Sequence, residues 1–189
     1  MYGEESFDSM GPVPTLAAGE YILWRGKPKK SAYIADKSLS MLPIAVIWLV
    51  IDFQFLRIAG GNGFLLMFLA VHLMPVWMWL GSTLTSVIQW RNEDYFVTNK
   101  RVIIRKGVFK AQIDTLFLRD VHSVRTHYGL LDRVFGSGDV YLNYAVQGYG
   151  KHRHTTGWFL MNLADPEQLR ERIELLALEQ TGRNEEIYH

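Results

Sequence analysis

The chain has 189 residues, no cysteine and a formal net charge of +1 at pH 7. Without cysteine it can form neither disulfides nor thiolate metal sites, and this composition fits a reducing compartment. A nearly neutral chain offers no electrostatic footprint for DNA or RNA, so we expect no nucleic-acid partner. The length allows one or two small structural units.

The N-terminal part precedes the apolar segments of the chain. Residues 1–19 contain glycine, proline, serine and acidic residues without periodicity, which predicts a flexible tail. Residues 20–37 form the approach to the apolar region and begin with a short strand, Tyr21–Arg25. Gly26 and Pro28 end that strand.

Two long apolar runs follow, at Leu39–Ala59 and Phe64–Ile88. A helix rises about 1.5 Å per residue, so about 20 such residues cross the ~30 Å hydrocarbon layer of a membrane. The break between the runs, Gly-Gly-Asn-Gly, leaves no room for a domain. Residues 38–90 are therefore predicted to form a two-helix transmembrane hairpin, bent at Pro75.

Cations flank this hairpin on both outer sides and are scarce in its connecting loop. They are Arg25, Lys27, Lys29, Lys30 and Lys37 before it, and Arg91, Lys100, Arg101, Arg105 and Lys106 after it. Because cationic loops resist translocation, we expect both termini in the cytoplasm and the turn outside, in a multi-pass protein of the cell membrane.

Residues 91–181 change to short β-rich segments followed by one amphipathic helix. The expected strands are 94–98, 101–107, 112–118, 121–127, 139–144 and 156–163, with a short helical turn inside 129–138. Asp165 and Pro166 start the last helix and Gly182 ends it. This order predicts an α+β unit, a small barrel or curled sheet capped by the C-terminal helix.

Three segments carry a family resemblance: Gly-Glu-Tyr-Ile-Leu-Trp-Arg-Gly-Lys-Pro at 19–28, Tyr-Phe-Val-Thr-Asn-Lys-Arg-Val-Ile at 95–103, and Leu-Asp-Arg-Val-Phe-Gly-Ser-Gly-Asp-Val at 131–140. With them, residues 19–175 resemble the membrane-anchored bacterial pleckstrin-homology-like (PH-like) domains. The resemblance implies a bacterial membrane protein with a seven-stranded barrel, to which Tyr21–Arg25 supplies one strand. It brings no catalytic residue and no cofactor.

Asp52 and His72 are the polar side chains deepest in the predicted hairpin. Each lies ten residues from Asn62 in the turn, so both lie about 15 Å down their helices. An unpaired charge at that depth is costly, which favours a hydrogen-bonded pair that clasps the two helices. A proton or ion relay is the alternative, and it needs an oligomer to enclose a path.

Four clustered residues are the candidate surface site: Lys151, His152, Arg153 and His154. Interleaved cations disfavour a metal ion, so we expect no metal site and instead consider contact with anionic head groups or a protein partner. A solvated loop without a ligand is the other interpretation.

No motif for a catalytic nucleophile, a paired-carboxylate site or a metalloprotease occurs, so we expect no enzyme. The predicted function is a cytoplasmic PH-like domain held at the inner membrane surface for protein assembly, self-association or anionic-lipid binding. The alternative is a subunit of a small transporter or channel that uses Asp52 and His72.

Overall fold

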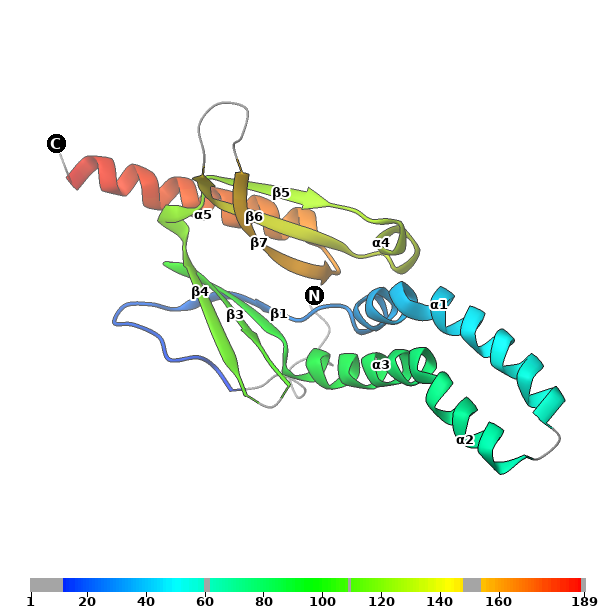
Figure 1. Ribbon diagram of the computed structural model, residues 1–189. Helices are drawn as coiled ribbons and strands as arrows, with labels where there is room; N and C mark the ends of the chain where they lie inside the picture. Colours follow the sequence, from blue (N-terminus) through cyan, green and yellow to red (C-terminus); the bar gives the residue numbers. More distant parts are fainter. Residues whose placement is uncertain (1–11, 60–61, 109, 148–153, 188–189) are drawn as a thin grey trace.

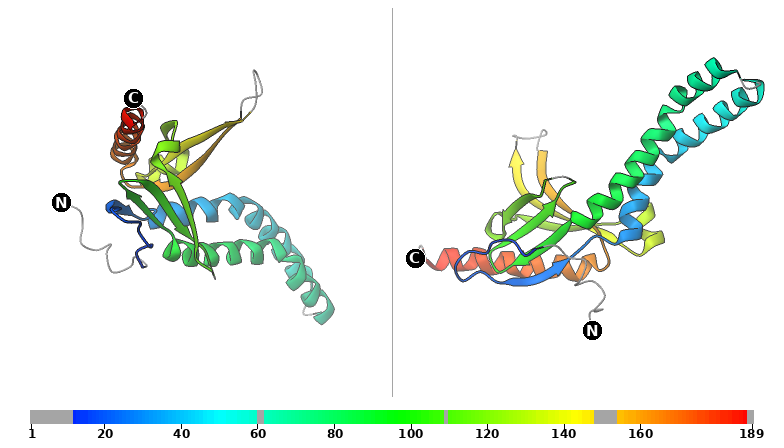
Figure 2. Two further views of the ribbon diagram at one scale, coloured as in Figure 1. Left: turned by 90° about the vertical axis from the view of Figure 1, so that its left-hand side faces the viewer. Right: turned by 90° about the horizontal axis from the view of Figure 1, so that it is seen from below.

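The computed structural model describes residues 12–59, 62–108, 110–147 and 154–187. It has an α+β fold in which a helical hairpin projects from a unit of two β-sheets and a C-terminal helix (Figure 1). The hairpin and the C-terminal end of the last helix point away from each other, at opposite ends of the molecule (Figures 1 and 2).

The hairpin consists of α1 (Lys30–Ala59), α2 (Gly63–His72) and α3 (Met74–Asn92). The second arm bends by 47° at Leu73, the residue between α2 and α3, and Pro75 lies in the first turn of α3. This bend confirms the prediction from Pro75, whose ring cannot continue the preceding helix. Within the described residues, one helix is long and apolar enough to cross a membrane, at Lys30–Arg57, and α2 with α3 would count as a second if taken together.

Four antiparallel strands form the first sheet in the order β1-β2-β3-β4. They are β1 (Ile22–Gly26), β2 (Asp94–Thr98), β3 (Arg101–Lys106) and β4 (Gln112–Phe117). The pairing of Arg25 with Phe96 confirms that the segment before the hairpin supplies a strand to the sheet that follows it. The sheet therefore joins both ends of the hairpin.

The second sheet has the order β5-β6-β7 and is also antiparallel. The remaining elements are η2 (Leu118–Asp120), β5 (Ser123–His127), α4 (Leu130–Phe135), β6 (Gly138–Gln147), β7 (His154–Leu163) and α5 (Pro166–Ile187). Asp165 accepts a hydrogen bond from Gln168 N at 3.2 Å, as expected for the start of α5. The prediction that Gly182 ends this helix is wrong, because α5 continues to Ile187.

One hydrophobic core lies between the two sheets and beneath α5. Its buried members include Tyr95, Val97, Val102, Ile104, Leu116, Leu118, Val124, Val140, Leu142, Leu160, Leu169 and Ile173. The expected barrel is not closed in the described residues, because no ladder joins the two sheets. The turn at η2, whose Leu118 side chain is buried in the core, separates β4 from β5, and residues of both sheets contribute to that one core.

Residues 12–20 have no regular secondary structure, and three of them contact β3, whereas residues 1–11 of the predicted flexible tail 1–19 lie outside the described residues. Arg105 donates to Pro12 O and Arg101 donates to Thr15 O. Arg101 also donates from Nε to Oε1 of Glu20 at 2.8 Å. Burial alone would raise the pKa of Glu20, but the hydrogen bonds from Arg101, from the backbone of Ala17 and from Thr98 hold that pKa at about 2.

Candidate functional site

The two polar side chains of the hairpin meet between its arms. Nδ1 of His72 lies 2.6 Å from Oδ1 of Asp52, a hydrogen bond that joins α1 to α2. The rings of Trp48 and Phe68 stack against the imidazole with centroid distances of 5.6 and 5.3 Å. The aromatic rings therefore cover His72 with apolar surface, while Asp52 is 4% exposed.

A small apolar cavity of about 250 Å³ adjoins this pair. It is lined by Leu49, Asp52, Phe53, Leu56, Leu69 and Leu73. The second carboxylate oxygen of Asp52 has no hydrogen-bond partner among the described residues. The contact with His72 is thus the hydrogen bond that holds this buried carboxyl group in place.

The predicted surface cluster lies at the boundary of the described chain. Lys151, His152 and Arg153 fall outside the described residues, and His154 is the first residue of β7, with no described side chain. Within the residues that the structure does describe, no group of three or more His, Cys, Asp or Glu side chains is arranged to hold a metal ion.

A buried polar network connects the hairpin to both sheets. The carboxylate of Glu93 accepts hydrogen bonds from Tyr33 of α1 at 2.7 Å and from Tyr95 of β2 at 2.6 Å. Tyr95 in turn accepts from Met161 N in β7 at 3.2 Å, and Lys37 donates to the Tyr33 hydroxyl at 2.8 Å. Burial, reinforced by the Glu93 charge, raises the pKa of Tyr95 well above its usual value, so the hydroxyl stays a donor.

A second group of charges fixes the strand before the hairpin to the end of α3. Asp94 is fully buried and forms an ion pair with Arg105, and its other oxygen lies 3.8 Å from Nζ of Lys27. Lys27 also donates to Arg91 O at 2.7 Å and lies over the ring of Trp90. Burial lowers the pKa of Lys27, although the Asp94 charge opposes the change.

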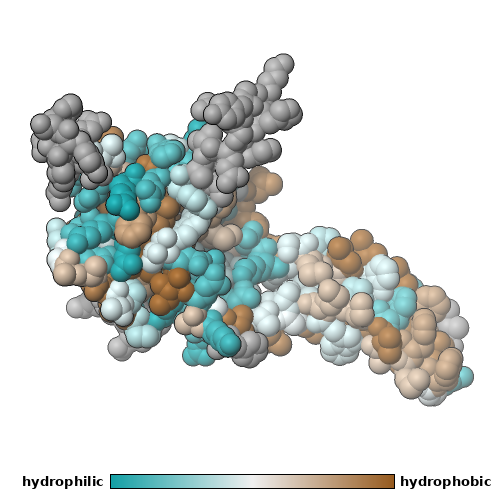
Figure 3. All heavy atoms as spheres, turned by 60° about the vertical axis from the view of Figure 1, so that its left-hand side comes forward, coloured by the Kyte–Doolittle hydropathy of each residue, from teal (hydrophilic) through white to brown (hydrophobic). Residues whose placement is uncertain are grey.

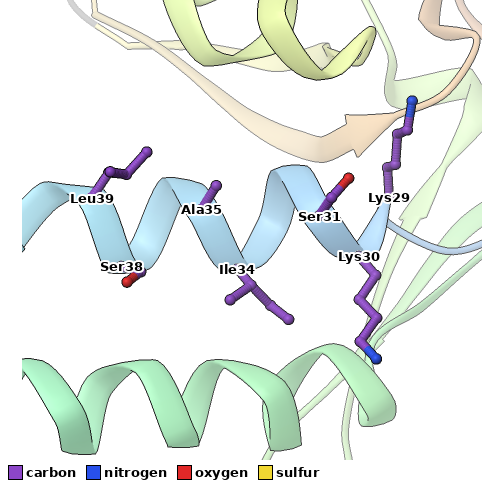
Figure 4. A pocket seen from close by; sticks show the side chains of 7 residues that line it. All are labelled: Lys29, Lys30, Ser31, Ile34, Ala35, Ser38 and Leu39. Atoms are coloured by element: carbon purple, nitrogen blue, oxygen red, sulfur yellow. The ribbon is translucent and has the colours of Figure 1, made fainter.

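An open groove of about 720 Å³ runs along the first turns of α1. It is lined by Lys29, Lys30, Ser31, Ile34, Ala35, Ser38 and Leu39. Lys29 points toward α4 and Lys30 toward α3, while the apolar side chains follow along the helix (Figure 4). The groove therefore passes from two exposed cations at one end to the beginning of the apolar run at the other.

Comparison with known proteins identifies the fold. The family model for the bacterial PH domain matches residues 41–177, which is well over half of the chain. The chain belongs to the bacterial PH domain family. No curated protein and no solved structure matches it. In this bacterial PH domain the match begins inside α1 and ends inside α5, so it includes most of the hairpin as well as β2–β7.

The family predicted from the sequence is thereby confirmed, whereas the match does not show the membrane anchoring that the resemblance also implied. Sequence reasoning missed the Glu93 network, because its two tyrosines lie at sequence separations of 60 and 2 residues and follow no motif. A useful signal was available in the acidic pair Glu93-Asp94, which lies directly between a membrane-like segment and a strand.

Proposed function

We propose that this chain is an integral protein of the bacterial cytoplasmic membrane that holds a non-enzymatic PH-like domain against the inner surface. In this proposal, residues 38–90 cross the membrane twice and both termini are cytoplasmic. Residues 91–181, together with the strand at 21–25, form the domain that binds a ligand or partner. The family assignment supports this, because PH domains are typically binding modules without catalysis.

The main evidence for this proposal is the exposed apolar surface of the hairpin. Soluble proteins rarely expose large continuous apolar patches, since each exposed Å² costs about 25 cal/mol. Hydrophobic residues dominate the outer part of the hairpin, whereas hydrophilic residues dominate the visible face of the sheet unit (Figure 3). The exposed members include Ile44, Val46, Ile47, Leu49, Val50, Phe53, Phe64, Met67, Val71, Met78 and Leu84.

The polar network at the inner end of the hairpin supports a fixed orientation of the domain. Trp90 donates from its ring nitrogen to Pro28 O at 2.7 Å, and Lys30 lies 5.3 Å from the centre of the Trp90 ring. Tryptophan and lysine are the residues that membrane–water interfaces favour. With Glu93 bonded to both α1 and β2, the domain cannot rotate freely about the hairpin.

Two ligand classes fit a domain held in this position, namely anionic head groups and a membrane-protein partner or second copy. Lys29 and Lys30 are exposed where the hairpin leaves the sheet unit. Near an anionic leaflet each such cation contributes about 1 kcal/mol. Lys151, His152, Arg153 and His154 remain a proposed contact for the same ligands.

The anchoring is tested by washing membranes with alkaline carbonate, which releases peripheral proteins. We expect the full chain to stay in the membrane pellet. Ile47→Arg should reduce integration, because an arginine near the middle of a membrane helix costs about 2.5–3.5 kcal/mol on the insertion scale. Leu178→Arg on α5 is the matched control, since Ile47 and Leu178 are 58% and 65% exposed.

Release of the unmodified chain by carbonate, or equal integration of the two arginine variants, would overturn the anchoring. The ligand class is tested by cross-linking in cells, followed by purification in mild detergent. A protein captured reproducibly by the unmodified chain supports assembly. Stronger binding to vesicles containing phosphatidylglycerol than to phosphatidylcholine vesicles supports recognition of anionic lipid.

A further inference from the structure

The short helix α4 exposes two large apolar side chains that the core does not use. Leu130 is 84% exposed and Val134 is 77% exposed, and both are among the most exposed hydrophobic residues in the described chain. Residues four apart lie on one face of a helix, so the two side chains form a single outward patch. Arg133, also exposed, lies beside them.

The position of α4 is fixed by hydrogen bonds at both of its ends. Asp132 accepts from Gly129 N at 2.7 Å and from the Ser137 hydroxyl at 2.8 Å. Gly136 ends the helix in the left-handed conformation, with φ 60°, which glycine adopts without strain. These hydrogen bonds therefore hold α4 in place, and with it the exposed Leu130 and Val134.

A third bond connects α4 directly to the start of the hairpin. Nζ of Lys29 donates to Phe135 O at 2.5 Å and to Gly136 O at 3.4 Å. The last carbonyls of a helix carry partial negative charge, so a lysine there is stabilising. Because Lys29 directly precedes α1, α4 cannot move away from the base of the hairpin without breaking this contact.

A small cavity between α4 and the hairpin shows which residues of α1 lie beside α4. This cavity of about 170 Å³ is lined both by Leu130 and Leu131 of α4 and by Asp36 of α1. Asp36 precedes Leu39 by three residues, or about 4.5 Å along a helix, and Leu39 begins the apolar run. The helix α4 thus lies beside the point where the hairpin becomes apolar (Figure 1).

We propose that α4 is a second membrane contact, whose Leu130 and Val134 insert into the boundary between head groups and acyl chains of the leaflet that the hairpin enters. The inference rests on the proposed anchoring, since the hairpin brings this leaflet to α4. An apolar patch with an adjacent arginine suits this boundary, because the side chains bury in the acyl region while the guanidinium stays with the phosphates. The ligand class is therefore a phospholipid surface.

The test uses the natural absence of cysteine from the chain. Leu130→Cys and Val134→Cys are each labelled with a polarity-sensitive fluorophore and reconstituted as full chains into vesicles of phosphatidylethanolamine and phosphatidylglycerol. The fluorescence is then measured again in vesicles of the same composition that also contain phospholipids with a nitroxide near the head group. We expect a blue-shifted emission and strong quenching by the nitroxide lipid at both positions.

Two further labelled variants separate this inference from the anchoring itself. Met67→Cys, in α2, reports insertion of the hairpin. Leu178→Cys, in α5, reports an apolar position that is far from the hairpin. The two positions are equally exposed, at 66% for Met67 and 65% for Leu178. For Met67→Cys, quenching is expected from lipids with the nitroxide deep in the acyl chain. Leu178→Cys should stay unquenched.

Quenching of Leu130→Cys and Val134→Cys, without quenching of Leu178→Cys, supports insertion of α4. If Met67→Cys is quenched while the α4 labels behave like Leu178→Cys, the insertion of α4 is wrong and the anchoring stands. If Met67→Cys is unquenched, both fail. Labels on α4 with blue-shifted emission but no lipid quenching would show that protein covers the patch, which also overturns the proposal.

Discussion

Removing the hydroxyl of Tyr33 should loosen the connection between the hairpin and the sheets by a measurable amount. In Tyr33→Phe, Glu93 loses the hydrogen bond of 2.7 Å from α1 and keeps the bond from Tyr95. Lys37 loses one acceptor and keeps Gln89. A buried hydrogen bond to a charged group is worth about 1.5–3 kcal/mol, which is the expected loss in free energy of unfolding.

Combining Tyr33→Phe with Tyr95→Phe tests the network more stringently, because both tyrosines donate to the carboxylate of Glu93 and their losses of unfolding free energy should not be additive. Glu93 is only 9% exposed, so Tyr33→Phe combined with Tyr95→Phe leaves a buried carboxylate without either hydroxyl. The second loss should cost more than the first, since one remaining donor still satisfies part of the charge. We expect the double variant to lose at least about 1 kcal/mol more than the sum of the two single losses, within the range of coupling energies seen for contacting residues.

The assay is urea unfolding of the purified full chain in mild detergent, with tryptophan fluorescence as the signal for unfolding. Tyr21→Phe is the control, because Tyr21 is 57% exposed and its change should stay within about 0.5 kcal/mol. Additive losses, or a Tyr33→Phe variant as stable as Tyr21→Phe, would refute the coupling of the hairpin to the domain through Glu93.

Changes at three other contacts, Asp52–His72, Asp94–Arg105 and Glu20–Arg101, also have expected outcomes. Asp52→Leu should lower stability by about 0.6–2 kcal/mol, the usual worth of an interhelical hydrogen bond in membranes, while Asp52→Asn with His72→Gln keeps normal protein levels in cells. Asp94→Ala should cost about 3–5 kcal/mol in urea unfolding, because it leaves Arg105 buried without its anion. Glu20→Gln should lower the melting temperature above pH 4.5, and its difference from the unmodified chain should vanish as the pH falls toward 2, because the Glu20 pKa is about 2 when folded and 4.5 when unfolded.

Each of these expectations has a result that contradicts it. Loss of a cellular phenotype in the neutral Asp52 and His72 double variant, at undiminished protein level, would favour a relay over a clasp. An Asp94→Ala variant as stable as the unmodified chain would show that the ion pair gives no net stability. A Glu20→Gln difference that is undiminished near pH 2, or that grows as the pH falls from 4.5, would show that Glu20 is not stabilised as a carboxylate.

The local elements of the fold were predictable, because their signals lie within a few residues. Asn99-Lys100 marks the turn between β2 and β3, and the strand Asp94–Thr98 has the predicted bounds. The equal distance of Asp52 and His72 from the turn at Asn62 predicted that they would lie at the same depth, and the structure places them within hydrogen-bonding distance. An antiparallel hairpin makes such counting reliable, since both arms start from one turn.

The long-range contacts were not predictable, because they join side chains to partners with no sequence pattern. Lys29 binds backbone carbonyls at Phe135 and Gly136, more than a hundred residues away, and every residue type offers a carbonyl. Closure of the barrel likewise depends on where one turn directs the chain. The turn at η2 begins at the buried Leu118, where the sequence predicted the end of a strand over 112–118, and no local pattern distinguishes such a turn from a continuing strand.

The topology of the hairpin is the most direct test of the account. Asn62→Cys, in the exposed turn, and Thr181→Cys, on exposed α5, each give a single thiol in a chain that has none. With an impermeant maleimide on intact bacterial cells, we predict labelling of Asn62→Cys, whereas Thr181→Cys should react only after permeabilisation. Labelling of Thr181→Cys in intact cells, or protection of Asn62→Cys until permeabilisation, would contradict a hairpin that crosses the membrane twice with its domain in the cytoplasm.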